Sequence, residues 1–294
     1  MIMSKIADGR LTAFSPSARI RVVLAEVTDS ARELERSHLC GPTAGLIQAE
    51  ALAAVALLGS DLVGADETVT FRMTVSGPLG GLLVEAAADG GLRGYTNAKV
   101  MEDFDVAEEF DTSSALGDRA EVQIIRSRPG KVISSGSVEV IPAAISHGLE
   151  LYYKQSLQRS AWVQTSALAY GAFIDSARGV MVECLPDGNG AVFARIEESF
   201  ADGTILDCLE ASASLKTVCE TLGLEDCTFD AGKPLKFACR CSVARVEGML
   251  AGLPAEDLRA MLAKGEPVQV FCHMCGKGYS VGLECLERVL GERE

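Results

Sequence analysis

The sequence predicts an α+β protein: an N-terminal, mostly antiparallel sheet domain with helices, then a helical linker, then a small C-terminal four-cysteine zinc domain. Glycine-rich turns between apolar segments indicate β-hairpins. These hairpins outnumber regular βαβ alternation, which favours an antiparallel sheet. Nine of the ten cysteines lie after residue 183, which sets the C-terminal part apart. We expect the three parts to span residues 1–186, 187–236 and 237–294.

The elements of the first part follow from local patterns in chain order. Residues 19–27 suit a strand, and Thr28 can cap a helix that runs to about residue 37. Residues 43–58 have the apolar density of a buried helix, and residues 143–159 also look helical. Further strands are expected over residues 68–76, 82–87, 92–96, 121–127, 132–140, 162–169 and 180–185.

The linker and the C-terminal part are expected to be largely helical. Residues 191–222 carry helical patterns, with Thr204 as a candidate cap for a second helix. This segment is too short for a strong core of its own, so its apolar face must lie on another surface. Residues 230–234 then indicate a loop that leads to the last part. There, residues 242–250 and 254–263 are helix-like.

Composition excludes several classes of partner. The chain has 41 acidic and 27 basic residues, a net charge of −14, and only 5% aromatic residues. Such a chain repels phosphates, so neither nucleic acid nor an anionic membrane is an expected partner. No secretory signal is apparent, and the apolar residues 51–58 are too few for a membrane span. We therefore expect a cytoplasmic protein, in which clustered cysteines indicate metal or redox chemistry.

The strongest motif is a set of two cysteine pairs, Cys239-Arg-Cys241 and Cys272-His-Met-Cys275. Four thiolates supplied as two close pairs match a tetrahedral Zn²⁺ site, and such a small unit would depend on the metal to fold. Free, merely buried cysteines are the alternative, but they do not explain the pairing. Spacing alone leaves open whether the zinc unit is purely structural or also redox-active, because each close pair could close a local disulfide.

The same motif, residues 237–242 and 270–279, resembles the redox-regulated thirty-three-kilodalton heat-shock chaperonin family. The resemblance extends beyond the cysteines and covers roughly residues 19–286 in the family's order. It includes a glycine-rich strand pair, a helix signature, the turn before the long apolar helix and the close of the first domain, at residues 76–80 with 91–95, 152–156, 38–43 and 182–186.

The resemblance implies a redox-regulated, ATP-independent holdase that is not an enzyme. In its reduced, inactive form, one Zn²⁺ per chain is expected on Cys239, Cys241, Cys272 and Cys275. Oxidation is expected to give the disulfides Cys239–Cys241 and Cys272–Cys275, to release zinc and to unfold the zinc unit. The linker then exposes apolar surface that binds unfolding client proteins, and the active form is expected to be a homodimer. The first domain is expected to take part in client binding and dimerisation.

Some residues depart from the family pattern or compete with this interpretation. The additional cysteines act either as small buried hydrophobic residues or as alternative disulfide partners; they are Cys40, Cys184, Cys208, Cys219, Cys227 and Cys285. Neither Cys285 nor His273 is expected to replace a zinc ligand. The rival function is a non-switching zinc-ribbon module that binds a protein partner. A thiol–disulfide enzyme would need a thioredoxin-like βαβ pattern, which is not apparent.

Overall fold

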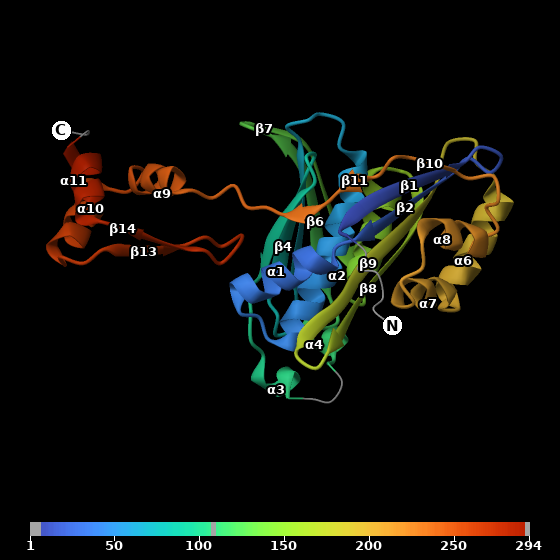
Figure 1. Ribbon diagram of the computed structural model, residues 1–294, viewed down its shortest axis with the longest axis horizontal. Coiled ribbons are helices and arrows are strands. Elements are labelled where there is room, and N and C mark those ends of the chain that lie inside the picture. Colours follow the sequence, from blue (N-terminus) through green and yellow to red (C-terminus); the bar gives the residue numbers. More distant parts are fainter. Residues whose placement is uncertain (1–6, 107–109, 292–294) are drawn as a thin grey trace. The chain divides into compact units, whose positions relative to one another are not determined.

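The computed structural model describes residues 7–106 and 110–291, which form two compact units (Figure 1). The first unit ends at Ala238 and the second begins at Cys239. The described part of the first unit holds two six-stranded sheets, and that of the second holds a two-stranded sheet. The α+β fold class predicted from the hairpin pattern is therefore confirmed. The three-part division at residues 186 and 236 stays a prediction about how the segments behave.

Both large sheets of the first unit are mainly antiparallel. One sheet has the order β10 (Thr228–Phe229), β1 (Gly9–Ser15), β2 (Ile20–Glu26), β9 (Phe173–Cys184) and β8 (Ser160–Tyr170), with β11 (Lys233–Pro234) also paired to β1. The other has the order β12 (Lys236–Phe237), β5 (Gly91–Thr96), β4 (Gly81–Ala87), β3 (Thr68–Val75), β6 (Ala120–Arg128) and β7 (Lys131–Val140). Only the short β12 runs parallel to its neighbour among the described strand pairs.

Helix α2 (Pro42–Leu58) lies between the two sheets and contacts β8 and β9 on one side and β4 and β5 on the other (Figure 1). Nearly all of its side chains are buried, as expected for a helix that is apolar all round. The segment Pro42–Asp61 is long and apolar enough to cross a membrane, but here it is the buried core helix of the first unit. The predicted buried helix is thus confirmed.

Smaller helices complete this layer. Helix α1 packs against α2 and β9, and α5 packs against β8. The bounds are α1 (Thr28–His38), the 3₁₀ turn η1 (Gly59–Asp61), α3 (Glu102–Asp105), α4 (Thr112–Leu116), α5 (Ile145–Leu151) and the π-helical turn η2 (Tyr152–Ser156).

The sheet that contains β2 is covered on both faces. Along β2, Val23 and Ala25 belong to the core around α2, whereas Val22 and Leu24 point into a second apolar cluster, because side chains alternate along a strand. That second cluster is completed by three helices, α6 (Gly190–Ala201), α7 (Thr204–Glu210) and α8 (Leu215–Thr221). The apolar face of residues 191–222 therefore lies on the sheet, as its short length required.

Several details differ from the sequence-based expectations. Strand β1 was not predicted, and part of the loop expected at residues 230–234 forms β11 on β1. Thr28 is the first residue of α1 and does not cap it; the Asp8 carboxylate accepts the N–H groups of Asp29 and Ser30 at 2.9 and 2.7 Å instead. A cap supplied from 21 and 22 residues away leaves no local signal. Likewise, Thr204 is the first residue of α7 and does not cap it; its own N–H donates to the Asp202 carboxylate at 2.9 Å.

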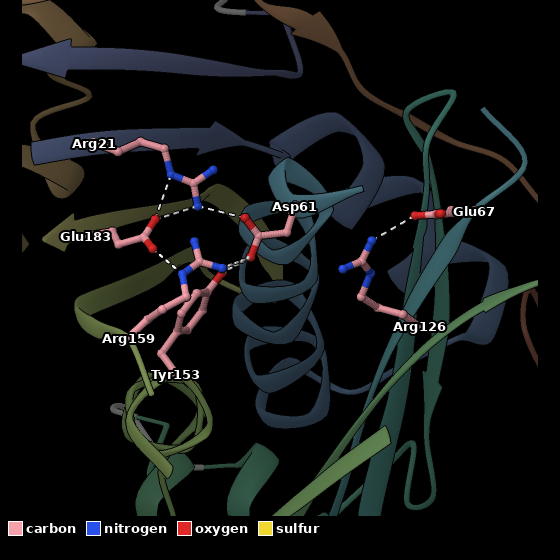
Figure 2. A network of polar contacts seen from close by, with 7 residues as sticks. All are labelled: Arg21, Asp61, Glu67, Arg126, Tyr153, Arg159 and Glu183. Carbon is pink, nitrogen blue, oxygen red and sulfur yellow. Dashed lines mark hydrogen bonds and ion pairs between the residues drawn. The ribbon is translucent and has the colours of Figure 1, made fainter. Parts of the chain in front are cut away.

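A polar network ties four elements of the first unit together (Figure 2). Arg21 on β2 donates to Glu183 Oε2 and to Asp61 Oδ1, both at 2.8 Å. Arg159 donates to the other oxygen of each carboxylate, Glu183 Oε1 and Asp61 Oδ2. The Tyr153 hydroxyl also donates to Asp61 Oδ2 at 2.9 Å. Two guanidinium groups and two carboxylates thus compensate one another, and together with Tyr153 on η2 they join β2, η1, η2 and β9.

Glu50 on α2 makes the stability of the first unit depend on pH. Burial raises the pKa of Glu50 to about 7, although the hydroxyl of Thr165 donates to it at 3.3 Å. The folded unit therefore holds a proton that the unfolded chain releases near pH 4.5. As a result, the free energy of unfolding should fall as the pH rises from about 5 to about 8. Because Glu50 keeps some solvent contact, we expect a fall of about 2 kcal/mol, and Glu50→Gln should abolish it.

Urea unfolding at several pH values, followed by the emission of Trp162, measures this effect, since Trp162 is the only tryptophan and lies on β8. Glu139→Gln, at an exposed position of β7, is the matched control and should keep the wild-type pH dependence. Parallel pH profiles for wild type and Glu50→Gln would contradict this assignment.

Candidate metal centre

The second unit has a small core of its own. Its described elements are α9 (Val243–Leu250), α10 (Ala255–Ala263), β13 (Val268–Phe271), β14 (Gly278–Val281) and α11 (Leu283–Gly291). Seven buried apolar side chains form this core: Val246, Leu250, Leu258, Tyr279, Val281, Leu286 and Val289. The two helices expected at residues 242–250 and 254–263 are confirmed as α9 and α10. Because so few side chains are buried, apolar burial contributes little to the stability of the second unit. The unit therefore needs a further source of stability.

The four predicted cysteines are placed by two short backbone segments. Cys239 and Cys241 precede α9, whose first turn is capped by Ser242: its hydroxyl oxygen accepts the N–H of Arg245 at 3.3 Å. Cys272 and Cys275 lie in the tight turn between β13 and β14. In that turn the N–H of Gly276 donates to the Cys272 carbonyl at 2.8 Å, and Gly276 has a φ of 69°, which favours glycine.

The structure brings these four side chains together. Their sulfur atoms all lie within 4.8 Å of one another; the Cys239–Cys272 distance is 3.7 Å and the Cys241–Cys275 distance is 3.4 Å. Sulfur atoms bound to one tetrahedral Zn²⁺, at about 2.3 Å each, would be about 3.8 Å apart. None of the four forms a disulfide in this structure. The donor set, which we call the cysteine quartet (Cys239, Cys241, Cys272 and Cys275), therefore fits a metal ion of this size.

The electrostatics of the quartet also favour a cation. Burial and the neighbouring Cys239 sulfur raise the pKa of the Cys272 thiol, and burial and the other three sulfur atoms raise the pKa of Cys275. Four thiolates so close together repel one another and cannot all ionise without a positive ion between them. A bound metal ion reverses this balance and holds the thiolates deprotonated. The quartet could therefore hold a metal ion.

The other candidates lie outside the quartet. His273 sits inside the β13–β14 turn and is exposed, and it is not part of the cluster. Cys285 on α11 accepts a hydrogen bond from Arg288 at 3.7 Å. Whether either residue can replace a ligand stays a prediction; in this structure the converging group is Cys239, Cys241, Cys272 and Cys275.

Tyr279 is a functional candidate to which sequence reasoning assigned no role. Its hydroxyl donates to Cys241 Sγ at 2.9 Å, and this hydrogen bond is the main reason why the pKa of Tyr279 is raised to about 12. A hydrogen bond to a thiolate draws electron density from the sulfur and lowers its reactivity. Tyr279 lies four residues after Cys275, the last cysteine of the quartet. This short spacing is the sequence signal that could have pointed to Tyr279, because β14 brings its ring back to the quartet.

Removing this donor should make Cys241 more reactive. In Tyr279→Phe, we expect the reduced, metal-loaded protein to react with peroxide at Cys241 about tenfold faster than wild type, because outer-sphere partners typically change metal sites by about 10- to 100-fold. Quenched-flow labelling with mass spectrometry measures the rate. Tyr170→Phe, at an exposed position of the first unit, is the control. Equal rates for Tyr279→Phe and wild type would show that the hydroxyl does not tune the sulfur.

The chain combines an α+β unit with a small unit in which four cysteines converge. Comparison with known proteins places it in the class of chaperonins of about 33 kDa. The family model described as "Hsp33 protein" matches residues 8–282, so the chain belongs to the Hsp33 family. This membership supports a chaperone role and agrees with a protein that is not an enzyme.

Individual relatives agree over nearly the whole chain. The chain is 26% identical to the 33 kDa chaperonin of Oceanobacillus iheyensis over 284 residues, 95% of this chain and 98% of that protein. It is 29% identical to the 33 kDa chaperonin of Thermus thermophilus over 93% of this chain and 84% of that protein. The crystal structure of the 33 kDa chaperonin of Thermotoga maritima has the same fold, with a TM-score of 0.86 at 19% identity, over 97% of this chain and 99% of that one.

Proposed function

We propose that the chain is a redox-regulated, ATP-independent holdase of the cytoplasm. In the reduced state the quartet holds one Zn²⁺, which keeps its thiolates deprotonated and adds to the stability of the second unit. This state has little chaperone activity. The single observation that carries the proposal is the convergence of the four sulfur atoms within 4.8 Å inside a unit with a very small core.

Oxidation removes the donor set. Disulfides between Cys239 and Cys241 and between Cys272 and Cys275 leave each pair closed on itself, so that nothing joins the two backbone segments and the metal is no longer held. Two close sulfur contacts run across the pairs, from Cys239 to Cys272 at 3.7 Å and from Cys241 to Cys275 at 3.4 Å. Cross-pair disulfides would keep the two segments together, so the proposed switch requires the within-pair arrangement.

The adjacent linker can respond because its strands are held to the first unit by short stretches of pairing. Strand β12 pairs with β5, and the N–H of Ala238 donates to the Leu92 carbonyl at 2.9 Å, one residue before the first cysteine of the quartet. Unfolding of the second unit leaves the end of β12 without a folded continuation. Terminal strands of two residues open readily, and local opening is how such elements expose surface.

The apolar surface for clients lies beneath the linker helices. Helices α6, α7 and α8 have 12, 7 and 7 residues, too few to be stable alone in water. They cover Ile20, Val22 and Leu24 of β2 through their own apolar side chains. If they detach, both faces of this contact become available to unfolding proteins. The high negative charge helps to keep the exposed form soluble, and we propose that this form is a homodimer.

The test follows metal, linker and activity in the same sample. Reduced, zinc-loaded protein is treated with hydrogen peroxide at mild heat; a zinc dye reports the metal, and light scattering reports aggregation of a denatured client. Trp162 stacks on Phe193 of α6, with ring centroids 6.1 Å apart, so its emission reports release of the linker. We expect zinc loss, a shift of the Trp162 emission and client protection, all reversed by a thiol reductant.

The controls separate the switch from its rival. Cys285→Ser, outside the quartet in the same unit, should respond like wild type. Size-exclusion chromatography with light scattering tests the homodimer. Retention of zinc under oxidation, or zinc loss without client protection, would leave only a non-switching zinc module for a protein partner.

A further inference from the structure

Two of the additional cysteines meet in the linker segment, far in sequence from the quartet. Cys219 is a buried residue of α8, and Cys227 is a half-buried residue directly before β10. Both pack in the second apolar cluster, and their thiols are hydrogen-bonded to each other. Both are free in the reduced chain. The two cysteines are therefore neighbours in one apolar cluster before any reaction.

The backbone between them fixes this contact. Helix α8 ends in a turn in which Gly223 has a φ of 70° and the N–H of Leu224 donates to the Cys219 carbonyl at 2.9 Å. The chain then reverses toward β1. Asp226 accepts hydrogen bonds from the Ser15 hydroxyl at 2.6 Å and from the Ser17 N–H at 2.8 Å, which anchors the residue next to Cys227. The two cysteines thus lie at the two ends of a short, anchored loop.

We propose that Cys219 and Cys227 are a second redox-active dithiol, which hydrogen peroxide converts to an intramolecular disulfide. The Cys227 thiolate attacks one peroxide oxygen, the O–O bond breaks, and the products are a sulfenic acid and hydroxide, which takes up the thiol proton as water. The Cys219 sulfur then attacks the sulfenic sulfur, the S–O bond breaks, and a second water leaves with the Cys219 proton. Two thiols lose two electrons and one peroxide becomes two waters.

The environment assigns the two roles. Burial raises the pKa of both thiols, and the shift is larger at Cys219. The hydrogen bond that Cys219 donates lowers the pKa of Cys227 and so opposes the effect of burial there. Cys227 is also the more exposed of the two. Cys227 is therefore the thiol that meets the oxidant, and Cys219 resolves the sulfenic acid. Their burial makes the pair slower than the metal-bound quartet.

The disulfide would tie α8 to the start of β10. Because β10 pairs with β1, the tie keeps this part of the linker on the sheet. On the proposed function, oxidised chains would therefore release α6 and α7 more readily than α8. The pair acts as a limit on opening, whereas the quartet triggers it.

Peptide mapping on the full-length, zinc-loaded protein tests the site. Trypsin does not cleave before proline, so the peptide of residues 217–236 contains Cys219, Cys227 and no other cysteine. After peroxide, acid quench and alkylation under denaturing conditions, we expect this peptide to become two hydrogen atoms lighter and unlabelled. Cleavage after Glu220 and Glu225 should then leave two peptides joined by a reducible bond.

Variants test the roles. Cys219→Ser should lose the disulfide and retain a dimedone-reactive sulfenic acid at Cys227. Cys227→Ser should give about tenfold less dimedone adduct at Cys219. Cys208→Ser is the matched control, since Cys208 packs in the same cluster and contacts Thr221; it should oxidise like wild type.

Two results would overturn the proposal: both thiols still alkylated after the quartet is fully oxidised, or a disulfide from either residue to Cys208. Zinc release is measured in the same samples, and Cys219→Ser/Cys227→Ser should keep it. Loss of the second disulfide and loss of the quartet switch are therefore distinguishable.

Discussion

Chelation of the metal that we propose for the quartet should unfold residues 239–294 of the reduced protein and leave the sheets of the first unit folded. The second unit has seven buried apolar side chains in its core, too few to offset the conformational entropy of its chain. Without a cation, its buried thiols are also pushed to the neutral form. Metal binding and folding are thus coupled, and the amides of β13 and β14 should lose protection by about 100-fold or more, about 3 kcal/mol.

Hydrogen exchange with mass spectrometry measures both units in one experiment. Peptides from β8 and β9 should exchange as before, because they lie in the large core of the first unit. Cys275→Ser should show the same loss without chelator, whereas Cys285→Ser should bind metal and exchange like wild type. If β13 and β14 stay protected after the metal is gone, the quartet is not what holds the second unit together.

Local patterns were enough to predict most of the longer elements and the four cysteines of the quartet, but not strand β1 or the short strands of the linker. A C-x-C pair and a C-x-x-C pair place two sulfur atoms each on short segments, and only a small unit needs four such donors at one point. The all-round apolar character of residues 43–58 likewise predicts a buried helix, although its place between two sheets was not predicted. In both cases the residues that cause the structure, the cysteines within each pair and the apolar residues of the helix, are close together in the sequence. A local pattern was therefore enough to predict the cysteine cluster and the buried helix.

Contacts between distant residues could not be predicted in this way. Asp8 caps α1 from 21 residues away, and Tyr279 reaches Cys241 only because β14 pairs with β13 in one register. The spacing of eight residues between Cys219 and Cys227 indicates nothing by itself. Their contact depends on the reversed chain after α8. Such features require coordinates.

The structure of the linker (residues 187–236) explains why its elements were hard to predict from the sequence. Its helices are short, and its strands β10, β11 and β12 have two residues each. Elements of this length gain their stability from the surface on which they lie and leave weak periodic signals. That property also suits the proposed function, because a segment stabilised mainly by docking can detach without disrupting the sheets beneath it.

Glu183→Ala should destabilise the first unit by about 3 kcal/mol, the largest loss that we expect from a single change there. Only 1% of the Glu183 side chain is exposed, and its two oxygens accept from Arg21 and Arg159 (Figure 2). Without it, two guanidinium groups share the single carboxylate of Asp61. Removal of one partner from a buried ion pair costs more than the pair contributes, because an uncompensated charge stays behind.

The pKa of Asp61 supports the same interpretation. Burial by itself would raise this pKa, but Arg21 and Arg159 hold it below its usual value. The stabilisation from Asp61 is therefore complete at neutral pH and is lost only as the pH falls through that low pKa. At neutral pH, Glu183→Ala thus tests a network in its charged form.

Urea unfolding followed by Trp162 emission gives the loss for Glu183→Ala and for two comparisons. Glu183→Gln keeps the shape and removes the charge, so it should lose an intermediate amount. Glu139→Ala breaks an exposed ion pair with Arg119, whose side chains are 62% and 68% exposed, and should cost at most about 0.5 kcal/mol. A loss for Glu183→Ala no larger than that for Glu139→Ala would show that the network does not stabilise the fold. A large loss for Glu183→Ala with little loss for Glu183→Gln would show that hydrogen bonding, and not charge, is what joins β2, η1, η2 and β9.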